Sequence, residues 1–415
     1  MILPPVPVAA ERRPRRLACY NSGVEKAGIY IHIPFCERKC TYCNFNTTDF
    51  FDGLSARYAE AVATEIANWG DTLASGENGS GSHFEGRLPV DTIFFGGGTP
   101  SIVEAGHLSS LVDACRASFD VEPDAEITIE VNPATFSRRK LEEWRASGIN
   151  RASVGVQSFI DRELAALSRT HTAADARRTL EGLREAGFDN VSLDLIAGLP
   201  EQTKEDWAFN LREALELRPE HLSLYLLEVK HGTQLYGQIK RGARPRPDDD
   251  LAADMYRMIC EATRGAGYEH YEISNFASAH KGLLRSKHNM KYWTGAPFYG
   301  MGCGAHSYDG RDRWVNALKT ESYIEMVEST GRAIAERNTL SDEERASEAL
   351  FMQMRLTEGV SLPEFRSRYG LDVVERHGPE LERLAEAGLV EMRGGRLKLT
   401  DAGLLLSNEV FVAFV

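Results

Sequence analysis

The sequence predicts an α/β fold built on six β-strands that alternate with helices, followed by a smaller helical domain. Six strand-like segments recur within residues 28–228, namely GIYIHIPF, VDTIFFG, EITIEVN, ASVGVQS, VSLDLIAG and HLSLYLLE. The segments between them, such as ADARRTLEGLREAG, have helical periodicity and consist largely of good helix formers. Strands that alternate with helices form parallel sheets. Six such units predict an incomplete (β/α)6 barrel that is open on one side.

Length, charge and cysteine count narrow the class of protein. A chain of 415 residues is long enough for two or three domains, and its net charge of -13 argues against a general nucleic-acid binder. No run of 18 or more apolar residues is present, so no transmembrane helix is expected, although peripheral membrane contact stays open. Seven cysteines and no export-signal pattern predict a cytoplasmic protein with reduced thiols.

Composition suggests four regions along the chain. Residues 1–27 are rich in Pro and Arg and are expected to form a disordered lead, and residues 28–240 form the barrel. Within the barrel, the Gly- and Ser-rich residues 71–88 predict a flexible insertion. Residues 241–340 begin with RGARPRPDDD, which is expected to be a charged linker whose Asp run caps the next helix.

Residues 341–415 differ from the barrel in their pattern of predicted secondary structure. Three amphipathic helices and a hairpin around Gly394 and Gly395 are expected, an arrangement that resembles a winged-helix module. Such modules often bind DNA, but this stretch mixes acidic and basic residues and has no clear basic recognition face. We therefore expect a lid or a protein-docking role for this domain.

Three cysteines follow the first predicted strand with the spacing C-x3-C-x2-C, at Cys36, Cys40 and Cys43. Thiolates bind soft metals and iron–sulfur clusters. A structural zinc site would need a fourth ligand. His32 is the nearest choice, but a strand residue that points to one face is a poor partner for this loop. Three thiolates on a four-iron cluster would instead leave one iron open to an exchangeable ligand.

Polar residues lie at the ends of the next strands, where β/α barrels place their sites. The second strand ends in GGGTP, where Gly97, Gly98 and Thr99 allow close approach of backbone amides to a ligand; a simple turn is the alternative. Strand residues of this polarity need partners when they are buried. Either structural pairing or ligand contact therefore explains the polar residues of the third, fourth and fifth strands, which are Glu130, Gln157 and Asp194.

The cysteine spacing, with the aromatic Tyr42 before the last cysteine, resembles the signature of the radical S-adenosylmethionine (SAM) superfamily. The resemblance implies a [4Fe–4S] cluster on Cys36, Cys40 and Cys43, with SAM chelated by the open iron through its amino and carboxylate groups. It also implies an electron donor, because in that superfamily electron transfer cleaves SAM to a 5'-deoxyadenosyl radical.

A narrower resemblance covers the chain from about residue 28 to the C-terminus. YIHIPFC, GGGTP, GVQSF, the R-x-H after it and DLIAGLP, in this order, look like the oxygen-independent coproporphyrinogen III oxidase family. In that family Arg169 is expected to pair with the SAM carboxylate. Position-wise matching implies the following SAM contacts: Tyr30, the backbone of Tyr42, Gly97, Gly98, Thr99, Glu130, Gln157, Arg169 and Asp194.

That family has two branches, and two features of this sequence indicate which branch it resembles. The porphyrinogen-decarboxylating branch has a further cysteine two residues beyond the third, where this chain has Phe45, and a longer N-terminal segment. HNMKYW, at residues 288–293, matches the H-N-x-x-Y-W motif of the HemW-type haem chaperone branch. The resemblance implies haem binding and transfer to haem-accepting haemoproteins. Oxidative decarboxylation of coproporphyrinogen III is the alternative function.

Within the motif, histidine is a common axial ligand of haem iron, so His288 is the leading candidate. Tyr292 and Trp293 offer flat aromatic faces for a macrocycle, with Asn289 beside them. For these residues considered without the resemblance, a core aromatic cluster with a hydrogen-bonded histidine is the alternative. Cys303 and His306, in the loop YGMGCGAHSY, rank below His288 as a second iron ligand.

Overall fold

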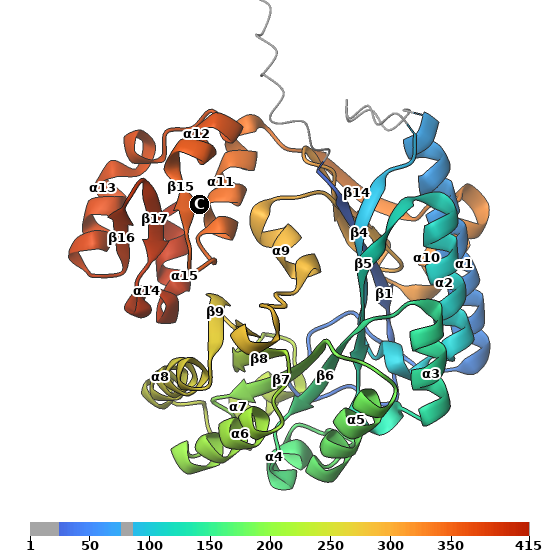
Figure 1. Cartoon of the computed structure of the whole chain (residues 1–415), viewed down its shortest axis with the longest axis horizontal. Coiled ribbons are helices and arrows are strands. Elements are labelled where there is room, and N and C mark those ends of the chain that lie inside the picture. The colour runs from blue at the N-terminus through green and yellow to red at the C-terminus, as the bar shows by residue number, and fades with distance from the viewer. Residues whose placement is uncertain (1–24, 76–85, 415) are drawn as a thin grey trace, which may run out of the picture.

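The structure is a computed structural model that describes residues 25–75 and 86–414. Its centre is a 12-stranded sheet in the order β14-β13-β12-β11-β1-β4-β5-β6-β7-β8-β10-β9 (Figure 1). The six predicted strands lie side by side and pair in parallel, which confirms the incomplete barrel. They are β1 (Ala27–Ile33), β4 (Pro89–Gly97), β5 (Asp120–Val131), β6 (Arg151–Gln157), β7 (Val191–Ala197) and β8 (His221–Leu226).

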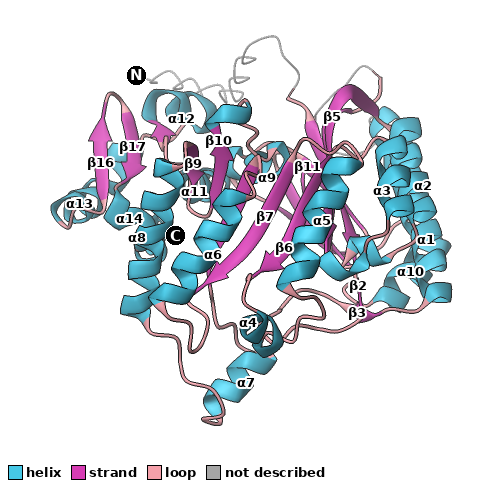
Figure 2. Cartoon of the chain, turned by 60° about the horizontal axis from the view of Figure 1, so that its bottom comes forward, coloured by secondary structure: helices cyan, strands magenta, loops and turns pink. Residues whose placement is uncertain are grey.

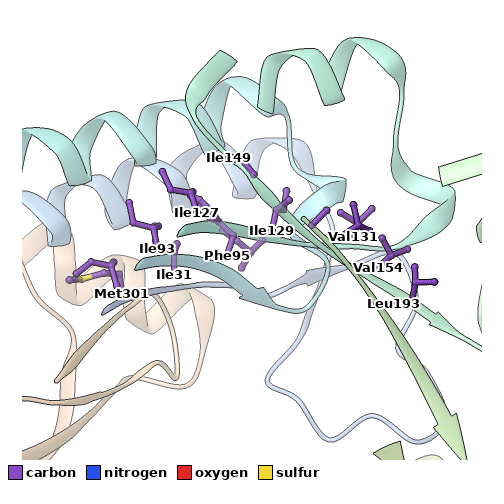
Figure 3. Close-up of a cluster of buried hydrophobic side chains, with 14 of the residues drawn as sticks. Ile31, Ile93, Phe95, Ile127, Ile129, Val131, Ile149, Val154, Leu193 and Met301 are labelled. Atoms are coloured by element: carbon purple, nitrogen blue, oxygen red, sulfur yellow. The ribbon is translucent and has the colours of Figure 1, made fainter. Parts of the chain in front are cut away.

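One face of these strands is apolar and is covered by helices. Ile31, Ile93, Phe95, Ile127 and Ile129 are fully or almost fully buried, and their side chains gather on this face (Figure 3). Because strand side chains alternate between faces, the residues between them point to the inside of the barrel. The barrel helices are α1 (Asp52–Ser75), α2 (Ala105–Ser118), α3 (Arg138–Ser147), α5 (Ala173–Glu185) and α6 (Lys204–Glu216).

Two short helices lie beyond the carboxyl ends of the strands, α4 (Asp161–Ala166) and α7 (Gln234–Lys240) (Figure 2). The flanking helices begin where the sequence supplies caps. Thr172 and Asp175 form a capping box on α5, and Thr203 and Asp206 form one on α6. No helix among the residues that the structure describes is long and apolar enough to cross a membrane.

Residues 241–340 form more structure than the expected linker and motif region. Asp248 caps α8 (Asp249–Gly265), as the Asp run predicts. The strands that follow extend the sheet at both edges. The sequence did not predict them, because they are short and of mixed polarity and give no clear strand pattern. They are β9 (Tyr268–Glu272), β10 (Asn275–Ser278), β11 (Phe298–Met301), β12 (His306–Tyr308), β13 (Asp312–Asn316) and β14 (Ile334–Thr339), with α9 (Lys287–Thr294) and α10 (Thr320–Thr330) between them.

The C-terminal domain joins helices to a small sheet in the order β15-β17-β16. Its helices are α11 (Asp342–Gln353), α12 (Leu362–Tyr369), α13 (Val373–Glu386), α14 (Asp401–Leu405) and α15 (Ser407–Phe411). Its strands are β15 (Val360–Ser361), β16 (Val390–Arg393) and β17 (Arg396–Leu399). Gly394 and Gly395 both have positive φ, as a tight two-residue hairpin turn requires, so the hairpin lies where the sequence predicts it.

Two predicted boundaries differ from the structure. Most of the predicted lead lies outside the described residues, but Ala27 is a buried residue of β1 and Lys26 pairs with Glu122. Of the predicted insertion, residues 71–75 form the last turns of α1 and Leu88 is buried before β4, while residues 76–85 lie outside the described residues. Apolar residues at the end of the lead and at both ends of the insertion belong to the neighbouring helix or strand, which composition alone did not indicate.

Candidate functional site

The three-cysteine loop runs between two short paired strands, β2 (Phe35–Cys36) and β3 (Thr48–Asp49). Its backbone is fixed from two sides. The Thr41 amide donates to the Leu167 carbonyl after α4 at 3.1 Å, and the Leu235 amide of α7 donates to the Thr41 carbonyl at 2.8 Å. These bonds hold the loop beyond the carboxyl ends of the strands, which is where the sequence places it.

The surroundings of the thiols suit a metal cluster. Cys36, Cys40 and Cys43 are half-buried free thiols, and burial raises the pKa of Cys36 and of Cys43. Arg169 Nη1 lies 3.6 Å from Cys40 Sγ, and Thr99 Oγ1 lies 3.4 Å from Cys36 Sγ. Thr99 and Arg169 offset part of the effect of burial at Cys36, and thiolates are the form in which cysteines bind iron. The donor set therefore fits an iron–sulfur cluster.

Among the described residues, no three His, Cys, Asp or Glu side chains are arranged to hold a single metal ion. Thiolates around a cluster bind different irons, so they need not converge on one point. His32, the fourth ligand that a zinc site would have used, has both ring nitrogens engaged. Its Nδ1 lies 3.1 Å from the Tyr30 hydroxyl and its Nε2 lies 2.9 Å from the Asn46 carbonyl oxygen.

The glycines at the end of β4 are required for close packing against β1. The Gly98 amide donates to the Ile33 carbonyl at 2.7 Å, and a Cβ on Gly98 would lie 2.7 Å from the Pro34 backbone. Gly97 has φ of 114°, and a Cβ there would lie 2.5 Å from the His32 ring. Any side chain at either position would push the two strand ends apart, so the GGG sequence has a structural cause as well as the proposed ligand role.

Two carboxylates face the inside of the barrel near these strand ends. Glu130 accepts the Gly97 amide at 3.0 Å, and burial raises its pKa to about 7, with a smaller contribution from Asp194. Asp194 accepts hydrogen bonds from Ser153 and Ser192 at 3.0 to 3.2 Å, and burial raises its pKa. Each carboxylate thus has a structural partner, and both lie close enough to interact.

Three other predicted SAM contacts surround the same strand ends. Gln157 ends β6 with φ of 64°, a left-handed conformation that is uncommon outside glycine. Arg169 donates to the Gly155 carbonyl at 2.7 Å and to Asn132 Oδ1 at 3.2 Å, in addition to its contact with Cys40. Tyr42 packs against the cluster of Leu167, Ile196 and Leu199, and burial raises the pKa of its hydroxyl.

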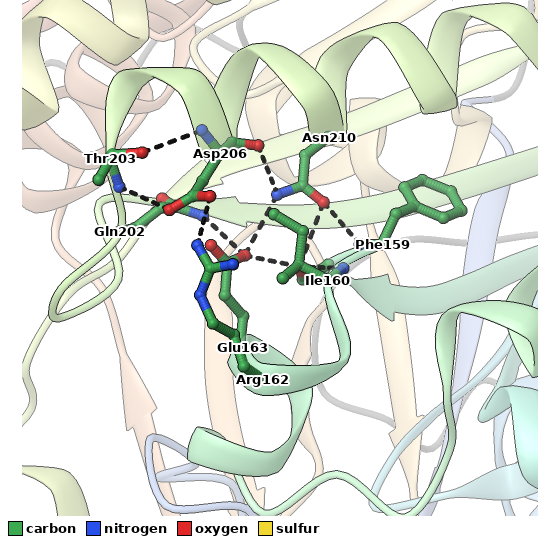
Figure 4. Close-up of polar contacts among 9 residues, drawn as sticks. Phe159, Ile160, Arg162, Glu163, Gln202, Thr203, Asp206 and Asn210 are labelled. Atoms are coloured by element: carbon green, nitrogen blue, oxygen red, sulfur yellow. Dashed lines mark hydrogen bonds and ion pairs between the residues drawn. The ribbon is translucent and has the colours of Figure 1, made fainter.

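A polar network that the sequence did not indicate fixes the loops after β6 and β7 (Figure 4). Glu163 of α4 accepts hydrogen bonds from Ser158, Gln202 and Asn210 at 2.6 to 3.2 Å. Asn210 of α6 accepts the Phe159 amide at 2.5 Å. The network joins α4 to α6, and so it positions the segments that carry Gln157 and the DLIAGLP loop. Its members are far apart in sequence and form no local pattern, so only their burial in the structure identifies them as a network.

Helix α9 carries the HNMKYW motif, and the side chain of His288 is fully buried between α9 and β4. The side chain is 1% exposed. Its Nδ1 lies 2.8 Å from Thr92 Oγ1 and its Nε2 lies 2.9 Å from the Tyr292 hydroxyl. The ring stacks on Phe94 with centroids 5.2 Å apart. Burial, then the charges of Lys291 and Arg151, lower its pKa to about 3, so the imidazole is neutral.

The C-terminal domain contacts the other end of the motif. The Arg355 guanidinium lies 4.3 Å from the centroid of the Trp293 ring, a cation–π contact. Arg368 of α12 donates to the carbonyls of Thr294 and Gly295 at 3.4 and 3.2 Å, where it complements the C-terminal end of the helix. The half-buried Asn289 lies in the first turn of α9.

The comparisons with known proteins agree with these features. The model of the radical SAM superfamily matches residues 30–214, and the model of the HemN C-terminal domain matches residues 340–406. The haem chaperone HemW of Bacillus subtilis is 36% identical over 387 residues, which cover 93% of this chain and 98% of that protein. The haem chaperone HemW of Synechocystis sp. is 38% identical, covering 92% of this chain and 95% of that protein.

This chain belongs to the HemW family of radical SAM proteins. The radical S-adenosyl methionine domain-containing protein 1 of Mus musculus is also similar, at 33% identity over 98% of this chain and 92% of that protein. The structure of coproporphyrinogen III oxidase (HemN) from Escherichia coli matches with a TM-score of 0.79 at 24% identity, covering 94% of this chain and 90% of that chain. That match shows the shared fold.

In this HemW family member, the two lower-ranked candidates for an iron ligand, Cys303 and His306, lie in different surroundings. Cys303 is fully buried, with Tyr58 Oη, Asn46 Nδ2 and Thr320 Oγ1 at 3.6 to 3.7 Å from its sulfur. His306 is exposed at the start of β12. The Cys303 loop packs behind the three-cysteine loop, because Asn46 also donates to the Cys303 and Leu318 carbonyls. Its glycine-rich sequence therefore has a packing role.

Proposed function

We propose that this protein binds haem and transfers it to haem-accepting haemoproteins in the cytoplasm, and that it carries a SAM-bound [4Fe–4S] cluster. The observation that carries the proposal is the similarity to proteins named haem chaperone HemW, which extends over more than nine-tenths of this chain. The HNMKYW helix and the three-cysteine loop are the parts of the structure that would perform the two tasks.

Cys36, Cys40 and Cys43 would bind three irons of the cluster, and SAM would occupy the fourth. When bound and reduced by an electron donor, the cluster supplies an electron to SAM. The chain's own contribution is orientation. Gly97 and Thr99 would line the amino acid part of SAM, with their own amides held by Glu130 and by the Phe35 carbonyl. The strand-end residues would receive its remaining polar groups: Tyr30, the Tyr42 backbone, Gly98, Glu130, Gln157, Arg169 and Asp194.

Haem coordination by His288 requires a change in α9. Both ring nitrogens are hydrogen-bonded, so an iron can reach Nε2 only after the Tyr292 hydroxyl has moved away. Tyr292 and Trp293 are half-buried, so a small displacement of α9 would expose their rings to a macrocycle. Because the cation–π contact of Arg355 covers Trp293, the C-terminal domain would release that face when haem binds.

The position of Phe45 favours haem transfer over porphyrinogen decarboxylation. Phe45 occupies the place of the further cysteine in the oxidase branch; its side chain is 60% exposed, and its carbonyl accepts a hydrogen bond from Lys39. No thiol stands at this position to assist an enzymatic reaction.

The test uses anaerobic, cluster-reconstituted protein with SAM, a reductant and coproporphyrinogen III. Product porphyrinogen and 5'-deoxyadenosine are measured in the same samples, and haem binding is titrated in parallel. We expect haem to bind and no decarboxylated product to form. Protoporphyrinogen at many turnovers would make the protein an oxidase, and protein with its cluster that binds no haem would also overturn the proposal.

A further inference from the structure

Arg151, the first residue of β6, is a buried cation without an ion-pair partner in the described part of the chain. Its side chain is 2% exposed, its Nε has no hydrogen-bond partner, and it forms no ion pair with a carboxylate among the residues that the structure describes. Arg151 is adjacent to Thr128 across the parallel pair β5–β6. Thr128 is fully buried, and its hydroxyl also has no hydrogen-bond partner among the described residues. Two adjacent hydrogen-bond donors are therefore left unused inside the barrel.

The polar residues around this pair are already satisfied. Ser192 Oγ lies 2.8 Å from His221 Nδ1, and Ser153 donates to Asp194. Glu126, on the layer below, accepts the backbone amide of His288 at 3.2 Å. Burial raises the pKa of Asp194, and the positive charge of Arg151 offsets a small part of this rise, but no ion pair forms with either carboxylate. The protein thus encloses a guanidinium that forms no direct ion pair with a carboxylate of the described residues.

A buried charge without a counter-ion destabilises a folded protein, so its retention indicates a ligand rather than a structural role. The guanidinium is planar and presents parallel N–H groups that fit a carboxylate in bidentate fashion. The Thr128 hydroxyl adds a third donor next to it. The chemistry of the pair therefore selects a carboxylate.

We propose that Arg151 and Thr128 form a carboxylate-binding site inside the barrel that receives a propionate group of the bound haem. This inference rests on the proposed function. The register supplies the link, because Thr128 is adjacent to Phe94 across β4–β5, and Phe94 is the ring on which His288 stacks. Thr128 therefore lies one strand away from Phe94, which the motif histidine contacts. The site is on the same inner face as Glu130 and Asp194.

The test compares haem with its dimethyl ester, in which both propionates are neutral. Arg151→Gln is expected to weaken haem binding about tenfold or more and to change the affinity for the ester less than twofold. Thr128→Val is expected to weaken haem binding a few-fold. Arg138→Gln, an exposed arginine on α3, is the matched control and should change neither affinity.

Thermal unfolding of the haem-free variant separates a ligand site from a structural one. Because Arg151 forms no ion pair with a carboxylate of the described residues, Arg151→Gln should unfold at the same or a higher temperature, whereas a structural arginine would give a lower one and overturn the proposal. An equal loss of affinity for haem and ester, or no loss, would also overturn it. If Arg151→Gln lost affinity for SAM and kept its affinity for haem, the carboxylate bound at this site would be that of SAM, and the assignment to a haem propionate would be wrong.

The two proposals fail in different ways. If the wild-type protein binds haem and Arg151→Gln binds it equally well, the carboxylate site is wrong and the proposed function stands. If the wild-type protein binds no haem, both are wrong.

Discussion

The three-cysteine loop and helix α9 carry the two most distinctive motifs of the sequence, and the structure holds them in different states. The thiols of the loop are half-buried beside Arg169 and Thr99, and the backbone is already fixed by α4 and α7. His288 of α9 is enclosed, with both ring nitrogens hydrogen-bonded. A recognisable motif therefore marks a preformed site in the loop and a closed site in α9.

The largest effect is expected at the loop. Cys40→Ala should reduce bound iron to near the background level after anaerobic reconstitution, because one of three thiolate ligands is lost from a site with no spare cysteine in the loop. Iron and acid-labile sulfide are the measurements. Cys260→Ala, at a partly buried cysteine of α8, is the control and should keep its iron. Full cluster content in Cys40→Ala would contradict the ligand assignment.

At α9 the enclosure of His288 predicts an acid-sensitive fold. The pKa of His288 is about 3 in the folded protein and 6.5 is its ordinary value, so the unfolded chain binds the proton more tightly. Stability is therefore full above pH 6.5 and is lost as the pH falls toward 3.

Between pH 7 and pH 4, the free energy of unfolding should fall by about 3 kcal/mol more in the wild type than in His288→Gln. Chemical denaturation at the two pH values measures this difference. Equal slopes for the two proteins would show that the imidazole is accessible to solvent, contrary to the closed geometry of α9.

At the strand ends the pH dependence has the opposite sign. The pKa of Glu130 is raised to about 7 from 4.5, so the folded protein binds this proton more tightly than the unfolded chain. The stability this confers is full below pH 4.5 and is lost as the pH rises through 7.

Glu130→Gln cannot ionise, so between pH 5 and pH 8 its free energy of unfolding should fall by about 2 kcal/mol less than that of the wild type, allowing for partial exposure. Glu142→Gln, at an exposed position on α3, should follow the wild type. Identical pH profiles for wild type and Glu130→Gln would mean that Glu130 titrates as an ordinary surface carboxylate.

The smallest effect tests whether α9 is closed by Tyr292. Tyr292→Phe removes the hydroxyl that occupies His288 Nε2, and one hydrogen bond is worth about 1 kcal/mol, or roughly a fivefold change in affinity. If His288 binds iron, haem should bind about fivefold more tightly to Tyr292→Phe and more weakly to His288→Ala, while iron in the cluster is unchanged. Tyr308→Phe removes a hydroxyl bonded to the Gly310 carbonyl and is the control. Unchanged haem affinity in both α9 variants would place the ligand elsewhere.

Local patterns in the sequence were enough to predict the six parallel strands and the place of the three-cysteine loop. Apolar segments with period two and turn residues at their ends are properties of neighbouring residues. The glycines of GGGTP were also predictable as a close approach, although their direct cause, the His32 ring and the Pro34 backbone, is a contact between distant segments.

The remaining features depend on long-range pairing. β11 pairs in parallel with β1, and β10 pairs with β8, but neither short strand has a pattern that distinguishes it from a loop. The enclosure of His288 depends on Thr92 and Phe94 of β4, nearly 200 residues away. Arg151 reads as an ordinary charged residue before a strand, and only the register of β5 and β6 shows that it lies inside the barrel.

Haem transfer itself most directly tests whether this protein is a haem carrier. Cluster-reconstituted protein loaded with one equivalent of haem is mixed with the purified apoprotein of a b-type haemoprotein, and the absorption spectrum of the acceptor is followed in time. We expect stoichiometric transfer to the acceptor, with His288→Ala loading less haem and delivering less. Retention of haem by the wild-type protein in the presence of excess acceptor would contradict a role as a haem carrier.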